Sequence, residues 1–435
     1  MTMAMSQDLS RKATILVILL LAPIFFFLNH ELEYTYEGAS IENSVNYSEK
    51  IDFEERAIEG NLQRRIALFS IGLFALLGMV FTKRRIRFTY DEPLGWVLFF
   101  FGVWSLASVL WSIEVPLTIR KLTTFGLFCF LAAALASRFP VNFVPECVFY
   151  LTALYIAAGL SVEIASQTFQ PWSGEYRFSG TVHPNIQAVN CTMMLFAAVS
   201  LAETPDRRRR VLYLSAATLG FVLLILTKSR TSLFCALLGF ITFFIINSPN
   251  KLKTSAYIFG ILCFFGILNI FIGEFMASDV KEVALLGRDT EETLTLTGRT
   301  SIWGKGLIFF GMRPLHGYGF NSFWTPPHIR MFSESMGWNI ADVHSAYLDL
   351  LLSVGLVGLL SYLLILALGM KKVFSTYIKT RETGYAFLLM IFIFLSVHGL
   401  LESELIEVTS IYSFVFIWGL FYLAFPSRES VGHAA

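Results

Sequence analysis

Charged residues are scarce in this chain of 435 residues, where Asp, Glu, Lys and Arg together make up only 15%. Soluble domains carry about 25% charged residues, so the composition argues against an ordinary water-soluble protein. The charges nearly cancel, with 33 basic and 32 acidic residues, so the chain has no excess of positive charge for binding nucleic acid. Charge therefore has to be interpreted loop by loop.

Cysteine is also scarce. The five cysteines show no C-x-x-C spacing, so the sequence predicts neither a disulfide framework nor a metal site (Cys129, Cys147, Cys191, Cys235 and Cys263). All five lie in or at the ends of apolar runs, where a small buried side chain is the simplest interpretation. We expect no metal and no cofactor.

Hydrophobic residues are abundant, at 55% of the chain with a mean hydropathy of +0.63. Apolar runs of roughly 17–20 residues recur, which is the length that crosses a hydrocarbon core of about 30 Å as a helix. Because lipid offers no hydrogen-bond partners, only helices or closed barrels span it, and continuous apolar runs exclude a barrel. The sequence therefore predicts an all-α polytopic membrane protein, built as one integral membrane domain over residues 1–435.

About twelve membrane spans are predicted, and the first is expected to be uncleaved because no small-residue cleavage site follows it. The spans cover residues 13–28, 66–82, 94–111, 117–137, 147–166, 184–202, 211–227, 232–247, 254–273, 345–369, 384–400 and 409–425. Alternate connections are basic, at 83–85, 207–210, 251–253 and 371–381. Basic loops face the cytoplasm, so both termini are expected there.

Two long connections are then expected on the periplasmic side. The first, residues 29–65, is mostly acidic, and the second, residues 274–343, is the large loop between the ninth and tenth spans. Apolar residues in the large loop predict an amphipathic helix near 299–311 at the membrane surface, ended by Pro314. No internal repeat indicates paired transporter halves.

Cations on the periplasmic side are exceptions to this charge bias. They are Arg177, Lys228, Arg230, Arg299 and Arg313. Each has a simpler explanation, since arginines at a membrane boundary often anchor on lipid phosphate or extend along apolar surface. Their convergence on short connections at one membrane face favours a binding site instead.

Histidines accompany these cations. His183 and Asn185 flank Pro184, which suits the first position of the sixth span and directs unpaired N–H groups outward as an anion site. His344 begins the tenth span, with Asp349 roughly on the same face. His183 as a helix cap and His344 as a satisfied interfacial histidine are the simpler alternatives.

Arginine forks donate two parallel hydrogen bonds to a diphosphate, and a histidine near neutral pKa suits deprotonation of a sugar hydroxyl. Together they indicate glycan transfer from a lipid diphosphate. Glu163, His398 and Glu402 are weaker candidates, noted because charges within spans often have a function.

Several motifs carry a family resemblance: R-F-S-G-T-V-H-P-N at 177–185, K-S-R-T-S at 228–232, T-G-R-T-S-I-W at 297–303, R-P-L-H-G-Y-G-F-N-S-F at 313–323 and H-S-A-Y-L-D-L-L-L-S-V-G-L-V-G at 344–358. In order and spacing they resemble the O-antigen ligase and polymerase superfamily (Wzy/WaaL-type) over residues 170–370. The chain is most similar in style to exopolysaccharide polymerases of the succinoglycan (ExoQ-like) kind.

The resemblance implies a metal-independent, inverting transfer from undecaprenyl-diphosphate-linked oligosaccharides at the periplasmic face of a bacterial inner membrane. Arg177 and Arg230 match the family's diphosphate-binding arginines, and His344 matches the histidine that positions or deprotonates the acceptor hydroxyl. Ser345 departs from the family, many of whose members carry Asn there. The residues expected to bind substrate are Lys228, His183, Asn185, Arg299, Arg313, Tyr318 and Asp349.

The expected partners are a lipid-linked oligosaccharide donor and acceptor, the bilayer, and a chain-length regulator or export complex. A polymerase is the leading interpretation, and a ligase that transfers glycan to lipid A-core or to a protein is the first alternative. A flippase or secondary transporter would show two similar halves. A peptidoglycan-type glycosyltransferase would rely on a carboxylate in the large loop, where Asp279, Asp289 and Asp342 lie.

Overall fold

The structure is a computed structural model, and it describes residues 2–29, 62–80, 93–173, 176–248, 250, 299–336, 340–403, 407 and 409–425. Within these ranges the chain forms helices joined by turns and irregular connections, without any strand. Eleven of the twelve predicted spans coincide with a helix, while span 254–273 and most of the acidic loop 29–65 lie outside the described residues. The prediction of a helical membrane protein is confirmed at this level.

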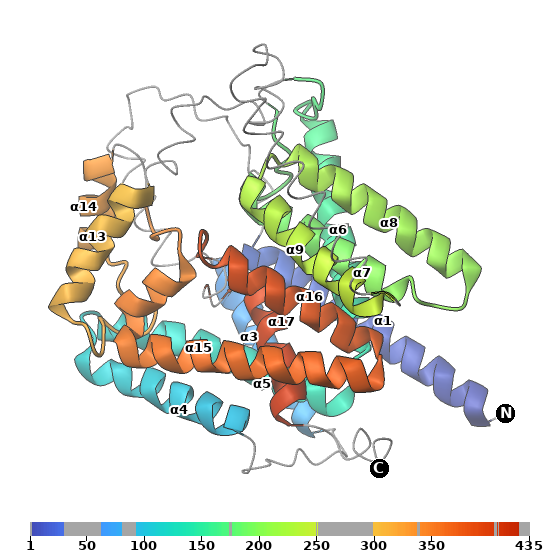
Figure 1. Ribbon diagram of the computed structural model, residues 1–435, viewed down its shortest axis with the longest axis horizontal. Helices are drawn as coiled ribbons and strands as arrows, with labels where there is room; N and C mark the ends of the chain where they lie inside the picture. The colour runs from blue at the N-terminus through green and yellow to red at the C-terminus, as the bar shows by residue number, and fades with distance from the viewer. Residues whose placement is uncertain are drawn as a thin grey trace.

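Figure 1 shows the helices as an oblique bundle with a smaller pair of helices beside it. The bundle contains α1 (Thr2–Asn29), α3 (Leu62–Val80), α4 (Pro93–Ala107) with the short 3₁₀ helix η1 (Ser108–Trp111), α5 (Val115–Arg138), α6 (Phe143–Ala165), α7 (Pro184–Leu201), α8 (Arg207–Leu226), α9 (Arg230–Asn247), α15 (Ala346–Thr380), α16 (Thr383–His398) and α17 (Ile411–Ala424). The smaller pair is α13 (Arg299–Met312) and α14 (Pro326–Met336).

Six helical segments of the described chain are long and apolar enough to cross a membrane, namely Pro93–Trp111, Val115–Arg138, Phe143–Ala165, Arg207–Leu226, Arg230–Asn247 and Ala346–Thr380. Ile15–Leu28, Thr383–His398 and Ile411–Ala424 are shorter apolar helices. Helices α7, α16 and α17 are buried along most of their length. In contrast, α4 and α8 expose large apolar side chains such as Phe99 and Leu212. Exposed apolar faces around a buried centre suit a hydrocarbon environment and would be unfavourable in water.

Consecutive helices run in alternate directions, so α6, α8 and α16 end where α7, α9 and α15 begin. We call this end of the bundle the polar end, because the connections 166–183, 227–229, 340–345 and 399–403 meet there. Pro184 is the first residue of α7, as predicted, where its missing N–H leaves no helical hydrogen bond unmade.

Helix α15 is broken near its middle by Gly355, which has a φ of 69°. The segment 313–319 fills the break: Leu356 N–H donates to the Pro314 carbonyl at 2.9 Å, and Tyr318 and Gly319 N–H donate to the Leu352 and Ser353 carbonyls. A helix break within a membrane span is stable only when its freed backbone groups find such partners. The sequence predicted a span over 345–369 and gave no sign of this break.

Close backbone contact explains two glycines at this break. A Cβ on Gly355 would lie 2.3 Å from the Leu315 carbonyl carbon, and one on Gly317 would lie 2.6 Å from the Leu352 oxygen. Both residues also have φ values near 68°, at 69° and 67°, which glycine adopts without steric cost. The position of segment 313–319 therefore depends on these two glycines.

Trp104 on α4 also stabilises the break in α15, because its indole N–H donates to the Val354 carbonyl at 2.9 Å. Phe at this position would remove this hydrogen bond, and such a bond typically contributes about 0.5–1.5 kcal/mol. We expect Trp104→Phe to lower the unfolding temperature in detergent, measured by fluorescence-detected elution after heating. Trp96→Phe on the same helix is the control, since the Trp96 side chain is exposed, and an equal loss in both variants would contradict this role.

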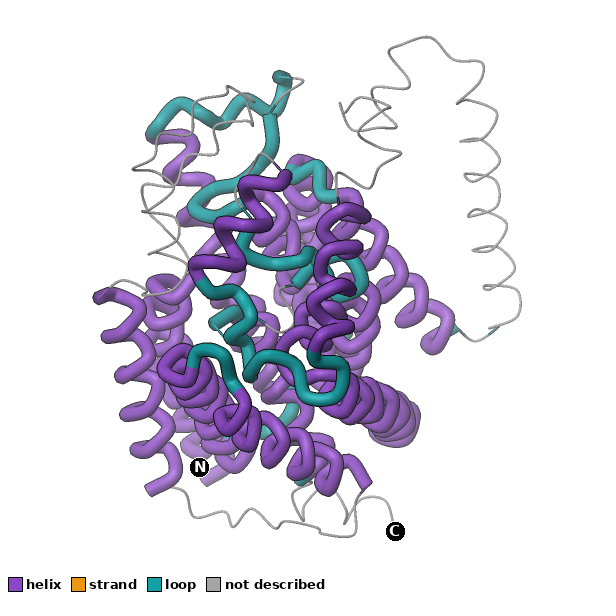
Figure 2. The backbone as a smooth tube through the Cα atoms, turned by 90° about the vertical axis from the view of Figure 1, so that its left-hand side faces the viewer, coloured by secondary structure: helices purple, strands orange, loops and turns teal. Residues whose placement is uncertain are grey.

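The described part of the large loop has a small core that it shares with α15. Its buried members are Ile302, Tyr318, Phe323, Phe332, Ile340, Val343 and Leu352. α13 occupies the predicted amphipathic segment, buries Ile302 and Gly306, and leaves Leu307 and Ile308 exposed. The sequence did not predict α14. In Figure 2 this layer of helices and loops lies nearest the viewer, in front of the bundle.

Candidate active site

Segment 176–180 carries Arg177 across the polar end. Phe178 N–H donates to the Leu226 carbonyl at 2.9 Å, and Arg177 Nε donates to the Thr227 carbonyl at 3.0 Å. Two carbonyl groups at the C-terminal end of α8 thus accept hydrogen bonds from a segment about fifty residues earlier in the chain. These contacts bring Arg177 to the turn that precedes Arg230.

Glu163, buried near the end of α6, holds this segment in place. Its carboxylate accepts hydrogen bonds from the Tyr176 hydroxyl at 2.6 Å, from Ser179 N–H at 2.9 Å and from Gly180 N–H at 2.6 Å. Burial and the Glu163 hydrogen bond raise the pKa of the Tyr176 hydroxyl well above its ordinary value, so it remains a donor. Glu163, a weaker candidate in the sequence, thus contacts the segment that positions Arg177.

Glu163→Gln is expected to reduce activity roughly tenfold, because one amide oxygen cannot replace a carboxylate that accepts from several donors. Arg177 would then be less well positioned, so the loss should be accompanied by greater protease sensitivity at 166–183. Limited proteolysis and turnover would be measured together. Glu146→Gln, in the first turn at the other end of α6, is the matched control and should change neither.

Asn185, in the first turn of α7, connects two charged side chains. Its amide oxygen accepts from Arg177 Nη2 at 3.0 Å, and its amide nitrogen donates to Glu402 Oε1 at 3.2 Å. His183 precedes the helix as an exposed N-cap, and its Nδ1 accepts from Asn185 N–H at 3.2 Å. The capping alternative for His183 therefore holds, and it sets the position of Asn185.

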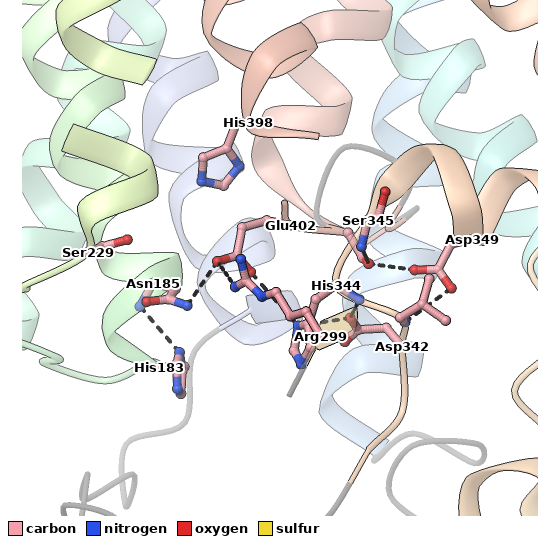
Figure 3. A network of polar contacts seen from close by, with 12 residues as sticks. His183, Asn185, Ser229, Arg299, Asp342, His344, Ser345, Asp349, His398 and Glu402 are labelled. Carbon is pink, nitrogen blue, oxygen red and sulfur yellow. Dashed lines mark hydrogen bonds and ion pairs between the residues drawn. The ribbon is translucent and has the colours of Figure 1, made fainter. Parts of the chain in front are cut away.

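Glu402 is the centre of the polar end. It is only 4% exposed, yet its Oε1 accepts from Arg299 Nη2 at 2.7 Å as well as from Asn185 (Figure 3). Burial raises the pKa of the Glu402 carboxyl above its ordinary value, and the adjacent Arg299 guanidinium opposes that rise. A buried carboxylate with an arginine partner joins α13 and α7 to the connection after α16.

His344 approaches the other oxygen of the same carboxylate. Its Nδ1 lies 3.1 Å from Asp342 Oδ1 and 3.9 Å from Glu402 Oε2. His344 has a φ of 52°, a left-handed conformation that is uncommon for residues other than glycine and often marks a functional position. With Nδ1 turned toward two carboxylates, Nε2 occupies the opposite side of the ring.

Asp349 lies close by, with other partners. Its Oδ1 accepts from the Trp324 indole at 2.8 Å, and its Oδ2 accepts from the Ser403 hydroxyl, which in turn accepts from Ser345 N–H at 3.0 Å. The sequence had placed Asp349 on the helical face of His344. That expectation fails because α15 begins at Ala346, so His344 precedes the helix. Asp349 instead stabilises the segment that carries His344, through the hydrogen bonds that connect it to Ser403 and Ser345.

Arg230 and Lys228 belong to the tight turn between α8 and α9. Arg230 is the first residue of α9 and is half-buried, and Lys228 has a left-handed φ of 54°. One turn into α9, Ser232 contacts the buried His398 of α16 through an Oγ–Nε2 distance of 3.0 Å. This contact connects the arginine's helix to the helix that precedes Glu402.

Arg313 and Tyr318 lie in a different place, beside the break in α15. Arg313 donates to the Trp111 carbonyl at 3.0 Å and lies over the Tyr318 ring, whose hydroxyl donates to the Phe309 carbonyl. These contacts join α13 to η1 and to the loop core. The structure therefore brings Arg177, Asn185, Arg299 and His344 into one network and places Arg313 and Tyr318 outside it.

Two carboxylates of this network, Glu402 and Asp342, were not among the predicted site residues. Glu402 had been noted only as a weaker candidate. The available signal was the unusual number of cations at the polar end, since buried cations require an anion. Across the described ranges, no group of three or more His, Cys, Asp or Glu side chains has an arrangement that could hold a metal ion.

These features define a polytopic helical membrane protein with a buried network of arginine, histidine and carboxylate at one end of its bundle. Residues 215–363 match the family model described as O-antigen ligase. This match supports the assignment of the chain to the O-antigen ligase and polymerase superfamily, and so confirms the resemblance at that level. It includes Arg230, Arg299 and His344, while Arg177, Asn185 and Glu402 lie outside the matched residues. A search of curated proteins finds no match.

Proposed function

We propose that this protein is a glycosyltransferase that polymerises polyprenyl-diphosphate-linked oligosaccharide repeat units, with the polar end facing the periplasm. The family match supports a polymerase or ligase role in polysaccharide or O-antigen assembly. The observation that carries the finer proposal is the convergence of Arg299, Asn185 and His344 on the buried Glu402 carboxylate. This arrangement presents cations and a histidine base at one place.

His344 acts as the general base for the acceptor hydroxyl. Donation of Nδ1–H toward Asp342 makes Nε2 the acceptor nitrogen of the ring, because a neutral imidazole carries one donor and one acceptor nitrogen. Glu402 stabilises the imidazolium that forms when Nε2 takes the proton. The acceptor oxygen then attacks the anomeric carbon of the donor sugar as the bond to the diphosphate breaks, which inverts the configuration.

Arg177 and Arg230 bind the leaving diphosphate. Both side chains are near the turn between α8 and α9. Arg177 contacts this turn through its hydrogen bond to the Thr227 carbonyl, and Arg230 is the first residue of α9. Guanidinium groups remain charged at every physiological pH and match phosphate geometry with two donors. Negative charge that develops on the leaving group is also stabilised by the N-terminal end of α9.

The direct test is polymerisation by the purified protein in bilayer discs, supplied with a lipid-diphosphate oligosaccharide and no added divalent metal. We expect a ladder of longer lipid-linked chains on gel electrophoresis. A product that forms only after a lipid A-core acceptor is added would show that the protein is a ligase and not a polymerase. Transport of the lipid-linked substrate without any new glycosidic bond would favour a flippase and would overturn the proposal.

Arg230→Lys is expected to reduce polymerisation roughly tenfold, because lysine keeps the charge and loses the two-donor fork. Arg230→Ala should lose more. The matched control is Arg207→Lys, since Arg207 is the exposed first residue of α8 at the opposite end of the bundle. Full activity in a folded Arg230→Ala protein would remove Arg230 from the diphosphate site.

A ligase is the second candidate, and the description of the matching family favours it. The two functions share the donor, the arginines and the base, and they differ only in the acceptor. Asp342, which contacts His344 and is partly exposed, lies where either acceptor would approach. The acceptor dependence of the assay above therefore separates the two functions.

A further inference from the structure

An apolar cavity of about 290 Å³ lies among α4, α5, α15 and α17, away from the Glu402 network. Its lining is almost entirely hydrocarbon and includes Phe99, Phe125, Tyr362 and Phe416. Three of its walls are helices long and apolar enough to cross a membrane, and the fourth is a shorter apolar helix. Its occupant therefore comes from the hydrocarbon phase.

We propose that this cavity binds a segment of the polyprenyl chain of the lipid-linked substrate, an inference that rests on the proposed function. The cavity reaches Leu350, the residue directly after Asp349, and Phe320, directly after the segment that fills the α15 break. One wall is thus continuous with the helix that follows His344. A chain bound there is tethered to a head group at the polar end.

Size and lining fit an isoprenoid segment. An engineered apolar cavity of about 150 Å³ takes a benzene molecule, so this cavity holds roughly two such units, or about ten to twelve carbons. Flat aromatic faces contact the planar, methyl-branched double bonds of an isoprenoid. Phe99 lines the cavity and is 57% exposed, so the cavity borders the bilayer and the remaining chain extends into lipid.

Gly102 offers a way to fill the cavity with little disturbance of the fold. It lies within α4, lines the cavity, and an added Cβ would meet nothing within 4 Å. Gly126 on α5 has the same open surroundings and does not line the cavity. Gly102→Phe and Gly126→Phe are therefore a matched pair, and Gly102→Leu is a smaller second variant.

The test uses a polyprenyl diphosphate that carries a photoreactive diazirine in its third isoprene unit, with the protein in discs of phosphatidylethanolamine and phosphatidylglycerol. We expect mass spectrometry to locate adducts on the peptides containing Gly102 and Cys129. Undecaprenyl diphosphate should displace them, and additional phosphatidylglycerol should not. In Gly102→Phe the phenyl ring occupies the cavity, so the polyprenyl chain can no longer bury its apolar surface there. This variant should therefore reduce the adducts about fivefold or more, while Gly126→Phe leaves them unchanged.

Two results would overturn the inference. One is labelling spread over the outer surface and insensitive to both Gly102 variants. The other is labelling of the cavity by a diazirine phosphatidylglycerol that undecaprenyl diphosphate does not displace, which would make a bulk acyl chain the occupant. Labelling needs no turnover, so cavity adducts without a glycan ladder would refute only the proposed function. A ladder without cavity adducts would refute only the polyprenyl site.

Discussion

Replacing Glu402 by alanine is expected to lower the free energy of unfolding by about 3–5 kcal/mol, because it removes one partner of a buried ion pair. The Glu402 and Arg299 side chains are 5% and 13% exposed, and their atoms are 2.7 Å apart. The variant would leave the arginine buried without its anion and Asn185 without its acceptor. Polymerisation should fall by about a hundredfold or more, since more than 2.7 kcal/mol of positioning would be lost.

A double-mutant cycle separates the structural part of this effect from the functional part. Arg299→Met alone leaves the Glu402 carboxyl buried, and without the opposing guanidinium its pKa should rise further. Arg299→Met with Glu402→Gln removes both charges, so thermal stability should recover much of what Arg299→Met alone or Glu402→Gln alone loses. Activity should not recover with it. Additive losses of stability would show that the two side chains are not coupled, and recovered activity would show that Glu402 has only a structural role.

Loss of the His344 imidazole is expected to reduce polymerisation by a factor of about 10²–10⁴, the usual contribution of a general base. His344→Asn is the most informative variant because asparagine tolerates left-handed backbone conformations, and His344 has a φ of 52°. The fold should therefore be retained. Turnover would be measured under saturating substrate, so that the loss is one of catalysis and not of binding.

The control for this prediction is another histidine of the large loop. His316→Asn changes a half-buried imidazole that meets the Trp111 ring edge-to-face beside the α15 break, away from Glu402. It should retain the activity of the unmodified protein. Nearly full turnover by a folded His344→Asn protein would remove His344 as the general base and would leave it as a positioning residue for the acceptor.

Much of the bundle could be predicted because a membrane span is a local property of the chain. A run such as 117–137 is long and apolar in itself, and the structure places α5 there with bounds close to the predicted ones. Pro184 likewise identified the start of α7 through its own geometry. The break in α15 was not predictable in this way. Gly355 lies in an apolar run, and its conformation depends on partners in segment 313–319.

The candidate site was predicted unevenly for the same reason. Arg177, Arg230 and His344 could be selected because each stands beside a recognisable span boundary or motif. Arg313 and Tyr318 belong to a comparable motif, yet their contacts stabilise the loop core. Motif membership alone does not separate a residue that faces the site from one that supports the backbone behind it.

By itself the sequence determined that the protein is a helical membrane protein, where most of its described helices lie, and which residue types gather at one end. Only the tertiary structure decided that Glu402 is the common partner of those residues. Arg299 is 103 positions away from Glu402 in the chain and Asn185 is 217 positions away. The length of an apolar run acts within one helix, whereas a buried carboxylate acquires its partners only when separate helices pack together and exclude water.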